Sequence, residues 1–324
     1  MTKKKSKKIL FITFDLSGYY DCILDELKMQ YTDVDFYNLA DYKNVPYVNL
    51  NQRLKSFYYK KVKKLKLKNF YKYNPIIQEI ANKKYDLTLI VRPDLFFDSQ
   101  LKVLRKNSTI LLAYYHDSIN NISRKKDVIH FFDKVYSYEK IDVKNYNLNF
   151  IPNFIYIKKT DKKKNITKPS FFTIISKDYR FNSLLKVASY LKNKNYDYKF
   201  LVHSNKKQPA NDIIDFIQER KNNDQVLEYI NQHSIIVDIH KFNIQDGLTF
   251  RVFESIFLEK KLITSNSDIK NYDFYNPNNI FIIEDFDAID IPETFISSPY
   301  EKIPNKIYHK YHYSYWLKTI LGTF

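Results

Sequence analysis

The residues best suited to chemistry lie in one short run, Gln245 to Glu254, that follows an apolar strand predicted over residues 235–239. The run contains Gly247, one of only three glycines among 324 residues, and a glycine here predicts either a positive φ angle or a close approach by a ligand. The helix predicted next carries Arg251 and Glu254 one turn apart on the same face. Backbone N–H groups and a guanidinium bind phosphate, whereas a carboxylate accepts hydrogen bonds from ribose hydroxyls. The run is therefore suited to bind a nucleoside diphosphate.

Three motifs stand in order in this region: Gln-x-Gly-Leu-Thr-x-Arg-x-x-Glu from Gln245, Lys-Lys-Leu-Ile-Thr-x-Asn from Lys260, and Tyr-Asp-Phe-Tyr-Asn-Pro-x-Asn-Ile from Tyr272. These motifs resemble bacterial glycosyltransferases of the lipopolysaccharide-core and capsule type, which are two-domain GT-B enzymes. The resemblance is strongest over residues 225–285. It implies that Glu254 holds the donor ribose and that the rest of the donor site includes Gly247, Leu248, Thr249 and Arg251. The alternative is a capped helix on which Arg251 and Glu254 form a solvated ion pair.

Two further cations are predicted to face the same ligand. Lys177 and Arg180 lie in a loop between a predicted strand and a predicted helix, where a diphosphate can meet a helix N-terminus. Fixed cations and N–H dipoles stabilise the charge that a departing nucleoside diphosphate gains, without a metal. In a chain this rich in lysine, the alternative is that both are ordinary surface cations.

Three residues of the first half are candidates for the base that takes a proton from an acceptor hydroxyl. Asp117 is favoured because it ends a predicted strand, where ligands of parallel sheets bind. His116 has a pKa naturally closer to neutral, and Asp15 follows the first strand. Strand alternation places His116 and Asp117 on opposite sides, so only one of them is expected to face the substrate. Asp117 can equally be a helix cap or turn residue.

Strand and helix patterns alternate along the chain, which predicts parallel sheets covered on both faces. In the first half we predict strands at 8–14, 34–37, 87–91, 109–113 and 134–138, and helices at 20–31 and 99–105. In the second half we predict strands at 171–176, 198–203, 235–239, 261–265 and 280–284, and helices at 182–194, 210–219 and 225–232. The fold class expected is α/β, with two Rossmann-like parallel-sheet domains facing a cleft (GT-B).

The like-charged stretch before Pro169 marks the predicted domain boundary. We expect an acceptor-side domain over 1–157, a linker over 158–169 and a nucleotide-sugar-binding domain over 170–307. By the resemblance, the C-terminal helix over 308–324 crosses back to the first domain.

Composition limits the functions that are plausible. The formal net charge of +17 attracts anions, which include nucleic acid, anionic membranes and nucleotide sugars. A single cysteine, Cys22, excludes an internal disulfide and fits a reducing compartment. No phosphate-binding loop, dinucleotide-binding glycine motif or Gly-x-Ser-x-Gly elbow occurs. The pairs His309 with His312 and Asp238 with His240 lack further ligands in the sequence, so we expect no metal and no other cofactor.

The segment over residues 53–72 is basic and has apolar residues at helical spacing. Such a helix can lie on an anionic membrane or dock on its own domain. No run reaches the ~20 apolar residues of a membrane span. We therefore expect a cytoplasmic protein that can attach to the inner face of the cell membrane.

The sequence favours transfer of a sugar from a nucleotide-sugar donor to a hydroxyl of a cell-surface glycan or glycolipid, with nucleic acid not expected as a partner. The net charge and interleaved aromatic residues leave a nucleic-acid-binding protein as one alternative. A catalytically inactive GT-B scaffold subunit is the other, although Arg251 and Glu254 argue against it.

Overall fold

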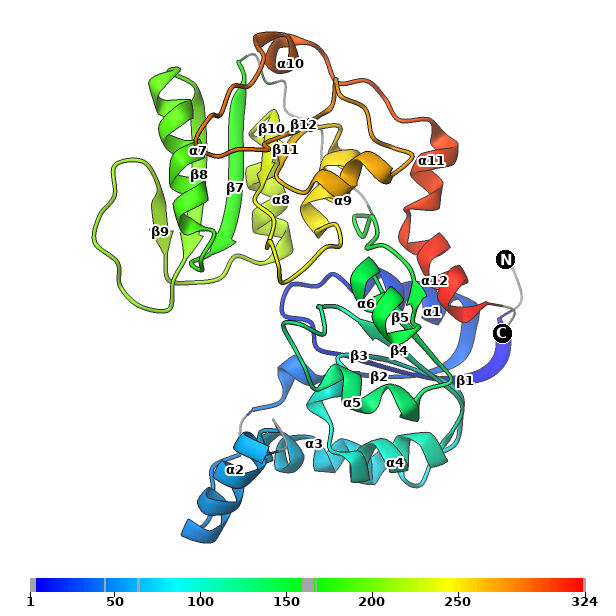
Figure 1. Cartoon of the computed structure of the whole chain (residues 1–324). Coiled ribbons are helices and arrows are strands. Elements are labelled where there is room, and N and C mark those ends of the chain that lie inside the picture. Colours follow the sequence, from blue (N-terminus) through cyan, green and yellow to red (C-terminus); the bar gives the residue numbers. More distant parts are fainter. Residues whose placement is uncertain (1–3, 44, 63–64, 159–165, 167, 323–324) are drawn as a thin grey trace. The chain divides into compact units, whose positions relative to one another are not determined.

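The computed structural model describes the whole chain except residues 1–3, 44, 63–64, 159–165, 167 and 323–324. The chain forms two compact units, Met1–Pro152 and Asn153–Phe324 (Figure 1). Each unit is built around one six-stranded sheet in which every pairing is parallel. The expected architecture of two parallel-sheet domains is confirmed.

The first sheet has the strand order β2-β1-β3-β4-β5-β6. Its strands are β1 (Lys5–Thr13), β2 (Tyr31–Asn38), β3 (Tyr85–Val91), β4 (Ser108–Tyr115), β5 (Lys134–Ser137) and β6 (Asn149–Phe150). Its helices are α1 (Asp21–Gln30), α2 (Leu50–Val62), α3 (Leu67–Ile80), α4 (Asp98–Lys106), α5 (Lys125–Val128) and α6 (Lys140–Tyr146), with short 3-10 turns at Leu39–Asp41, Pro93–Leu95 and Ile129–Phe131. Helix α1 covers one face, and α3 and α4 cover the other (Figure 1).

The central strands are apolar on both faces, because helices cover both sides of the sheet. Residues Ile9 to Ile12 of β1 are fully buried, and so are Leu87, Leu89 and Ile90 of β3. The side chains on one face of these strands pack against Tyr73, Ile77 and Leu104 of the covering helices. Continuous burial of this kind produces the uninterrupted apolar runs from which the sequence predicted these strands.

The second sheet has the order β12-β11-β10-β7-β8-β9. Its strands are β7 (Ser170–Ser176), β8 (Asp197–His203), β9 (Asp215–Ile217), β10 (Ile235–Asp238), β11 (Lys261–Thr264) and β12 (Ile280–Ile282). Its helices are α7 (Phe181–Asn193), α8 (Asn223–Asn231), α9 (Phe250–Leu258), α10 (Glu293–Ser297), α11 (Asn305–Lys310) and α12 (Tyr313–Leu321), with a 3-10 turn at Ser267–Asn271. Helix α8 packs on the face of the sheet opposite α7, where Tyr229 stacks on Phe172 with ring centroids 5.5 Å apart.

The helix predicted over 210–219 is wrong. Residues 215–217 instead form β9, which pairs with β8 at the edge of the sheet. An Asn211 side chain that accepts a hydrogen bond from the Ile213 N–H at 3.0 Å forms a turn there. Phe216 then stacks on Phe181 at 5.7 Å, so tertiary packing overrides the local helical preference.

The single C-terminal helix predicted from residue 308 is divided into α11 and α12. At the break, Ile155 forms a β-bridge: its N–H donates to the Tyr311 carbonyl at 2.7 Å, and its carbonyl accepts from the Tyr313 N–H at 3.1 Å. These contacts tie the two helices to residues 153–157 of their own unit. Because residues 153–157 belong to the second unit, the boundary falls at 152/153 rather than at the expected 157/158. Most of the predicted linker lies outside the described residues.

Candidate functional site

The predicted donor residues gather where the strand order of the second sheet reverses. Strands β7 and β10 are neighbours there. Strands β8 and β9 follow β7 toward one edge of the sheet, and β11 and β12 follow β10 toward the other. Ligands of open parallel sheets bind at the carboxyl ends of the strands at such a switch point. Two hydrogen bonds join the loops that follow β7 and β10: Arg180 Nη1 donates to the Ile239 carbonyl at 2.9 Å, and the Tyr179 hydroxyl donates to the Phe242 carbonyl at 3.1 Å. Lys177, Arg180 and the Gln245–Glu254 run therefore share one edge of the sheet.

Arg251 and Glu254 lie one turn apart on α9, as predicted, but they are not a solvated pair. The Glu254 side chain has no exposed surface, and Arg251 is only 16% exposed. One Glu254 carboxylate oxygen pairs with Arg251 Nη1, and the other accepts a hydrogen bond from the Tyr156 hydroxyl at 2.7 Å. The Glu254 carboxylate thus holds the Arg251 guanidinium in place at the start of α9. Tyr156 was not singled out from the sequence.

The two cations of the β7–α7 loop differ in how far their charge is neutralised. Arg180 is held in a fork by Asp178, with Nη2 2.8 Å from Oδ2 and Nε 2.9 Å from Oδ1. Burial alone would raise the pKa of Asp178, but the hydrogen bonds and charge of Arg180 lower it. Lys177 lies over the rings of Phe181 and Phe216 and donates to Gln208. Within the described residues it has no carboxylate partner, so Lys177 keeps the less compensated charge.

A buried polar cluster behind the loop holds residues 240–249 in place. Asp238 accepts hydrogen bonds from the hydroxyls of Thr249 at 3.1 Å and Thr264 at 3.4 Å. His240 Nε2 bonds to the Gln245 carbonyl at 2.6 Å, and Asn266 Nδ2 donates to the Asp246 carbonyl at 3.1 Å. Burial lowers the pKa of His240, although Asp238 opposes that shift. From the sequence, Asp238 and His240 were considered only as a pair of metal ligands, and this supporting role was not predicted.

The backbone conformation expected at Gly247 is not found. Among the glycines, positive φ occurs at Gly18 (86°) and Gly322 (61°). Gly247 and Leu248 are buried, and the Leu248 carbonyl accepts a hydrogen bond from Asn153 Nδ2 at 2.8 Å. Close packing of the loop against residue 153, rather than a left-handed turn, is what the structure shows there.

Two of the three base candidates of the first unit, Asp15 and His116, are joined through Tyr20. The Tyr20 N–H donates to Asp15 Oδ2 at 2.8 Å, and the Tyr20 hydroxyl is 2.7 Å from His116 Nδ1. Asp15 also accepts from the N–H groups of Ser17 and Gly18, both at 2.9 Å, so its carboxylate holds the turn before α1. The left-handed φ of Gly18 belongs to this turn.

His116 and Asp117 differ in chemical state and partners. Burial, reinforced by the charge of Lys125, lowers the pKa of His116 to about 4, which keeps the ring neutral at pH 7. Asp117 accepts from the Ser118 N–H at 2.8 Å and from Asn121 Nδ2 at 2.6 Å, the pattern of a turn residue. Its side chain remains partly exposed. The structure therefore gives Asp117 a turn role that does not exclude a catalytic one.

No group of three or more potential metal ligands occurs among the residues that the structure describes. Of the two pairs considered from the sequence, Asp238 with His240 is committed to the loop bonds given above. His312 Nδ1 bonds to Ser314 Oγ at 2.8 Å, and the side chain caps α12.

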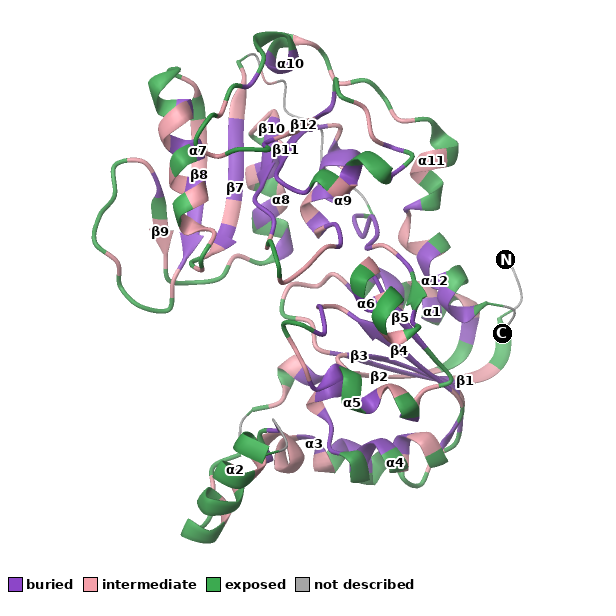
Figure 2. Ribbon diagram, in the orientation of Figure 1, coloured by how far each residue is buried: buried purple, intermediate pink, exposed green. Residues whose placement is uncertain are grey.

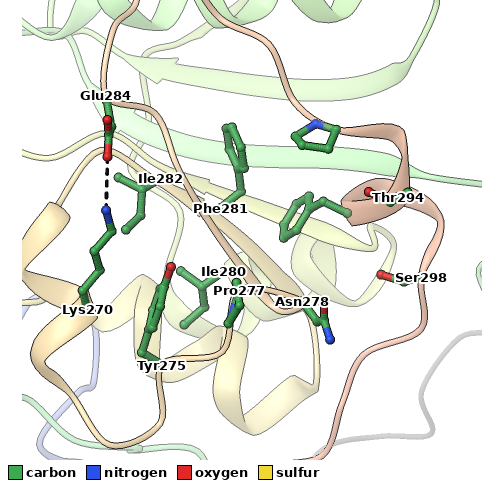
Figure 3. Close-up of a pocket in the computed structure, with 12 residues that line it drawn as sticks. Lys270, Tyr275, Pro277, Asn278, Ile280, Phe281, Ile282, Glu284, Thr294 and Ser298 are labelled. Carbon is green, nitrogen blue, oxygen red and sulfur yellow. Dashed lines mark hydrogen bonds and ion pairs between the residues drawn. The ribbon is translucent and has the colours of Figure 1, made fainter.

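A cavity of about 440 Å³ lies beside β12 in the second unit (Figure 3). Lys270 pairs with Glu284 at one end of it, with Nζ 3.1 Å from Oε1. Phe281 and Phe295 supply its apolar lining. None of the predicted donor residues lines this cavity, which is thus separate from the switch point.

Comparison with known sequences gives no match to a family model and none to a curated protein. Comparison with solved structures does give matches. The OtsA apo structure matches with a TM-score of 0.60 and 11% identity, covering 97% of this chain and 98% of the other. An alpha-glucosyltransferase in complex with UDP matches with a TM-score of 0.51 and 11% identity, covering 97% and 96%. A Methanocaldococcus jannaschii UDP-GlcNAc 2-epimerase in complex with UDP-GlcNAc and UDP matches with a TM-score of 0.50 and 11% identity, covering 86% and 88%.

These matches extend over both units, so they concern the architecture of the whole chain rather than one sheet. The identities are too low to carry residue roles from one protein to another. Together with the two six-stranded parallel sheets, they show that this chain has the GT-B fold of glycosyltransferases.

Proposed function

We propose that this protein is a glycosyltransferase that moves a sugar from a nucleotide-sugar donor to a hydroxyl of a cell-surface glycan, of the lipopolysaccharide or capsule type. The observation that carries the proposal is that the segments bearing Lys177, Arg180 and Arg251 follow the neighbouring strands β7 and β10 at the switch point of the second sheet. The GT-B fold, with solved neighbours that contain UDP, supports the same donor class. The motifs that resemble lipopolysaccharide-core and capsule enzymes support the acceptor class.

In this proposal, cations stabilise the leaving group. As the bond from the anomeric carbon to the diphosphate breaks, negative charge develops on the nucleoside diphosphate. Arg251 and Lys177 neutralise that charge together with the N–H groups at the starts of α7 and α9, so the reaction needs no divalent metal. When Arg251 turns toward the diphosphate, one Glu254 oxygen is released to accept a ribose hydroxyl. Glu254 thereby acts first on Arg251 and then on the donor.

The acceptor hydroxyl loses its proton to Asp117 as its oxygen attacks the anomeric carbon. Asp117 is preferred because its carboxylate is partly exposed. Asp15 is occupied by three backbone N–H groups, and His116 Nδ1 is engaged by the Tyr20 hydroxyl at 2.7 Å.

Attachment to an anionic membrane is part of the proposal, since a glycolipid acceptor lies at a membrane. Among the described residues, no helix is long and apolar enough to cross a bilayer. Helix α2 has no buried residue and is coloured mostly as exposed in Figure 2. Its apolar residues Leu54, Phe57 and Val62 are 63%, 61% and 56% exposed. An uncovered apolar stripe between lysines suits a cytoplasmic protein lying on the inner leaflet.

Nucleotide binding tests the function. UDP, GDP or CMP at 100 times its Kd is expected to stabilise the protein by ~2.7 kcal/mol, measured as a rise in melting temperature. An Arg251→Gln variant is expected to lose that rise. Salt-sensitive binding of DNA or RNA without any nucleotide effect would instead identify a nucleic-acid-binding protein. Because one solved neighbour contains UDP and a 13-mer DNA, a DNA oligonucleotide is also tested as an acceptor.

A further inference from the structure

A second cavity, of about 700 Å³, lies in the first unit and has no assigned role. It is lined by Phe14 after β1, Arg92 and Asp94 after β3, and Arg124 in the segment after β4. The first sheet reverses its strand order between β1 and β3. The cavity therefore occupies the switch point of this sheet, the position at which parallel sheets bind ligands.

The lining is strongly cationic. Five cations, Lys66, Lys68, Lys72, Arg92 and Arg124, face one carboxylate, Asp94. Arg92 and Asp94 neutralise each other through two hydrogen bonds of 2.9 Å. The three lysines have no carboxylate partner among the described residues, and burial lowers the pKa of Lys72. Lysines gathered in this way without carboxylate partners favour an anionic ligand.

Arg92 and Arg124 are held rigidly. Arg92 adopts the left-handed conformation, with φ 70° and ψ 53°, which is strained for a non-glycine residue. Its guanidinium lies 5.6 Å from the centre of the Phe14 ring. Arg124 is 6% exposed, and its Nη2 donates to the Phe96 carbonyl at 3.1 Å and to Asp98 at 2.6 Å. Arg124 Nε is buried without a partner in the described part of the chain, so this guanidinium retains an unused donor.

A helix N-terminus adds to the same field. Helix α3 begins at Leu67, and Lys66, Lys68 and Asn69 of its first turn line the cavity. The free N–H groups at a helix start favour negative charge.

We propose that this cavity binds a phosphate group of the acceptor, so that the molecule receiving the sugar is phosphorylated. The proposal rests on the proposed transferase function. Arg92 is paired with Asp94 and Arg124 with Asp98, which leaves the charges of the three lysines for a ligand, and a phosphate monoester carries about two negative charges. The cavity is also larger than a phosphate, which leaves room for the group that bears it. Exposed apolar side chains on the neighbouring α2 favour a lipid phosphate over nucleic acid.

The test is calorimetric titration of the full chain with glycerol 1-phosphate at low ionic strength. We expect saturable binding that weakens at least tenfold in a Lys68→Ala/Lys72→Ala variant. The control Lys55→Ala/Lys60→Ala variant removes the same charge from α2 outside the cavity and is expected to change affinity less than twofold. Equal losses in both variants would reduce the effect to diffuse surface charge and overturn the proposal, and so would the absence of saturable binding. If the double variant does not fold, Lys68→Gln alone is compared with Lys55→Gln.

Two further ligands identify the source of the phosphate. Tighter binding of dihexanoyl phosphatidic acid than of glycerol 1-phosphate would support a lipid acceptor, and equal binding would support recognition of the phosphate alone. Preference for a 5′-phosphorylated dinucleotide over both would overturn the acceptor proposal in favour of nucleic acid. Failure of nucleotides to stabilise the protein, with cavity-dependent phosphate binding retained, would reject the transferase function but not the phosphate site. Stabilisation by nucleotides without phosphate binding would reject the phosphate site but not the transferase function.

Discussion

At the scale of single residues, the state of Glu254 decides how the donor site can work. A Glu254→Gln substitution keeps the side-chain shape and a hydrogen bond to Tyr156, but it removes the charge that holds Arg251. Loss of a charge-assisted hydrogen bond costs about 1.5–3 kcal/mol, so we expect nucleotide affinity to fall roughly 10- to 100-fold in calorimetry.

A Glu228→Gln substitution on the exposed face of α8 is the control for this experiment. It removes the same charge without touching the site. Nucleotide affinity that is the same in the Glu254 and Glu228 variants would remove Glu254 from donor binding. Glu254→Ala is less informative, because leaving Arg251 unpaired destabilises the fold by about 3–5 kcal/mol in the general case of a buried pair.

Asp117 offers a second prediction. Asp117→Asn should lower turnover by about 10²- to 10⁴-fold and preserve donor binding, because the donor residues lie in the other unit. Asp127→Asn, at an exposed position of α5, is the matched control. If the Asp117 variant keeps near-normal turnover and Asp15→Asn loses turnover instead, Asp15 is the base.

The buried histidine gives a prediction on pH. The pKa of His116 is about 4 in the folded protein, below its usual value of 6.5, so the unfolded chain binds the proton more readily. Above about pH 6.5, His116 therefore does not change the free energy of unfolding. As the pH falls toward 4, His116 lowers the free energy of unfolding by about 3 kcal/mol. Urea unfolding should show a shallower decline between these pH values for His116→Gln than for wild type. A His309→Gln control, at an exposed site, should follow the wild type, and identical slopes in all three proteins would reject this role of His116.

Among the helices, α2 has apolar residues that do not pack against the rest of the first unit. Tyr59 packs on Phe97 with ring centroids 5.3 Å apart, and Leu65, just after the helix, is buried in the same cluster. Leu54, Phe57, Tyr58 and Val62 of the apolar stripe stay exposed, whereas Leu65 at its end is buried, so only the end of the stripe docks on its own domain. The residues between α2 and Leu65 lie outside the described part of the chain.

Sedimentation with vesicles tests whether α2 binds membranes. Each lysine near an anionic leaflet contributes about 1 kcal/mol, so Lys55→Glu/Lys60→Glu/Lys61→Glu should abolish binding to anionic vesicles. Binding should also weaken as salt rises from 0.1 M to 1 M, because the Debye length shrinks from ~10 Å to ~3 Å. Lys102→Glu/Lys106→Glu/Lys134→Glu changes the same charge elsewhere on the first unit and should bind as wild type does. Equal binding to neutral and anionic vesicles would contradict the electrostatic part, and full binding by the α2 variant would leave the helix as scaffold.

At the scale of the whole molecule, the proposal assigns all charge stabilisation to the protein. Transfer from a nucleotide sugar should therefore proceed in EDTA at the rate seen without it. The cations at the starts of α7 and α9 replace the metal that other enzymes use on a diphosphate. Activity that disappears in EDTA and returns with Mg²⁺ or Mn²⁺ would overturn this assignment. Activity that is unchanged in EDTA would support it.

The sequence alone located most of the buried strands and the helix that bears Arg251 and Glu254. Buried strands of a parallel sheet require apolar runs, and the helix period is local, so both are visible without coordinates. The same locality explains the failures. Residues 210–219 have a helical pattern, but pairing with β8 and the Phe181 contact make part of them a strand.

Only the tertiary structure decided which distant residues share a site. It buried Glu254 beneath Arg251 with Tyr156, almost a hundred residues earlier, and it joined Asp15 to His116 through Tyr20. It also placed Arg92 and Arg124 in one cavity with the first turn of α3. The physical reason is that burial and charge compensation depend on contacts across strands, and sequence spacing does not encode which strands become neighbours.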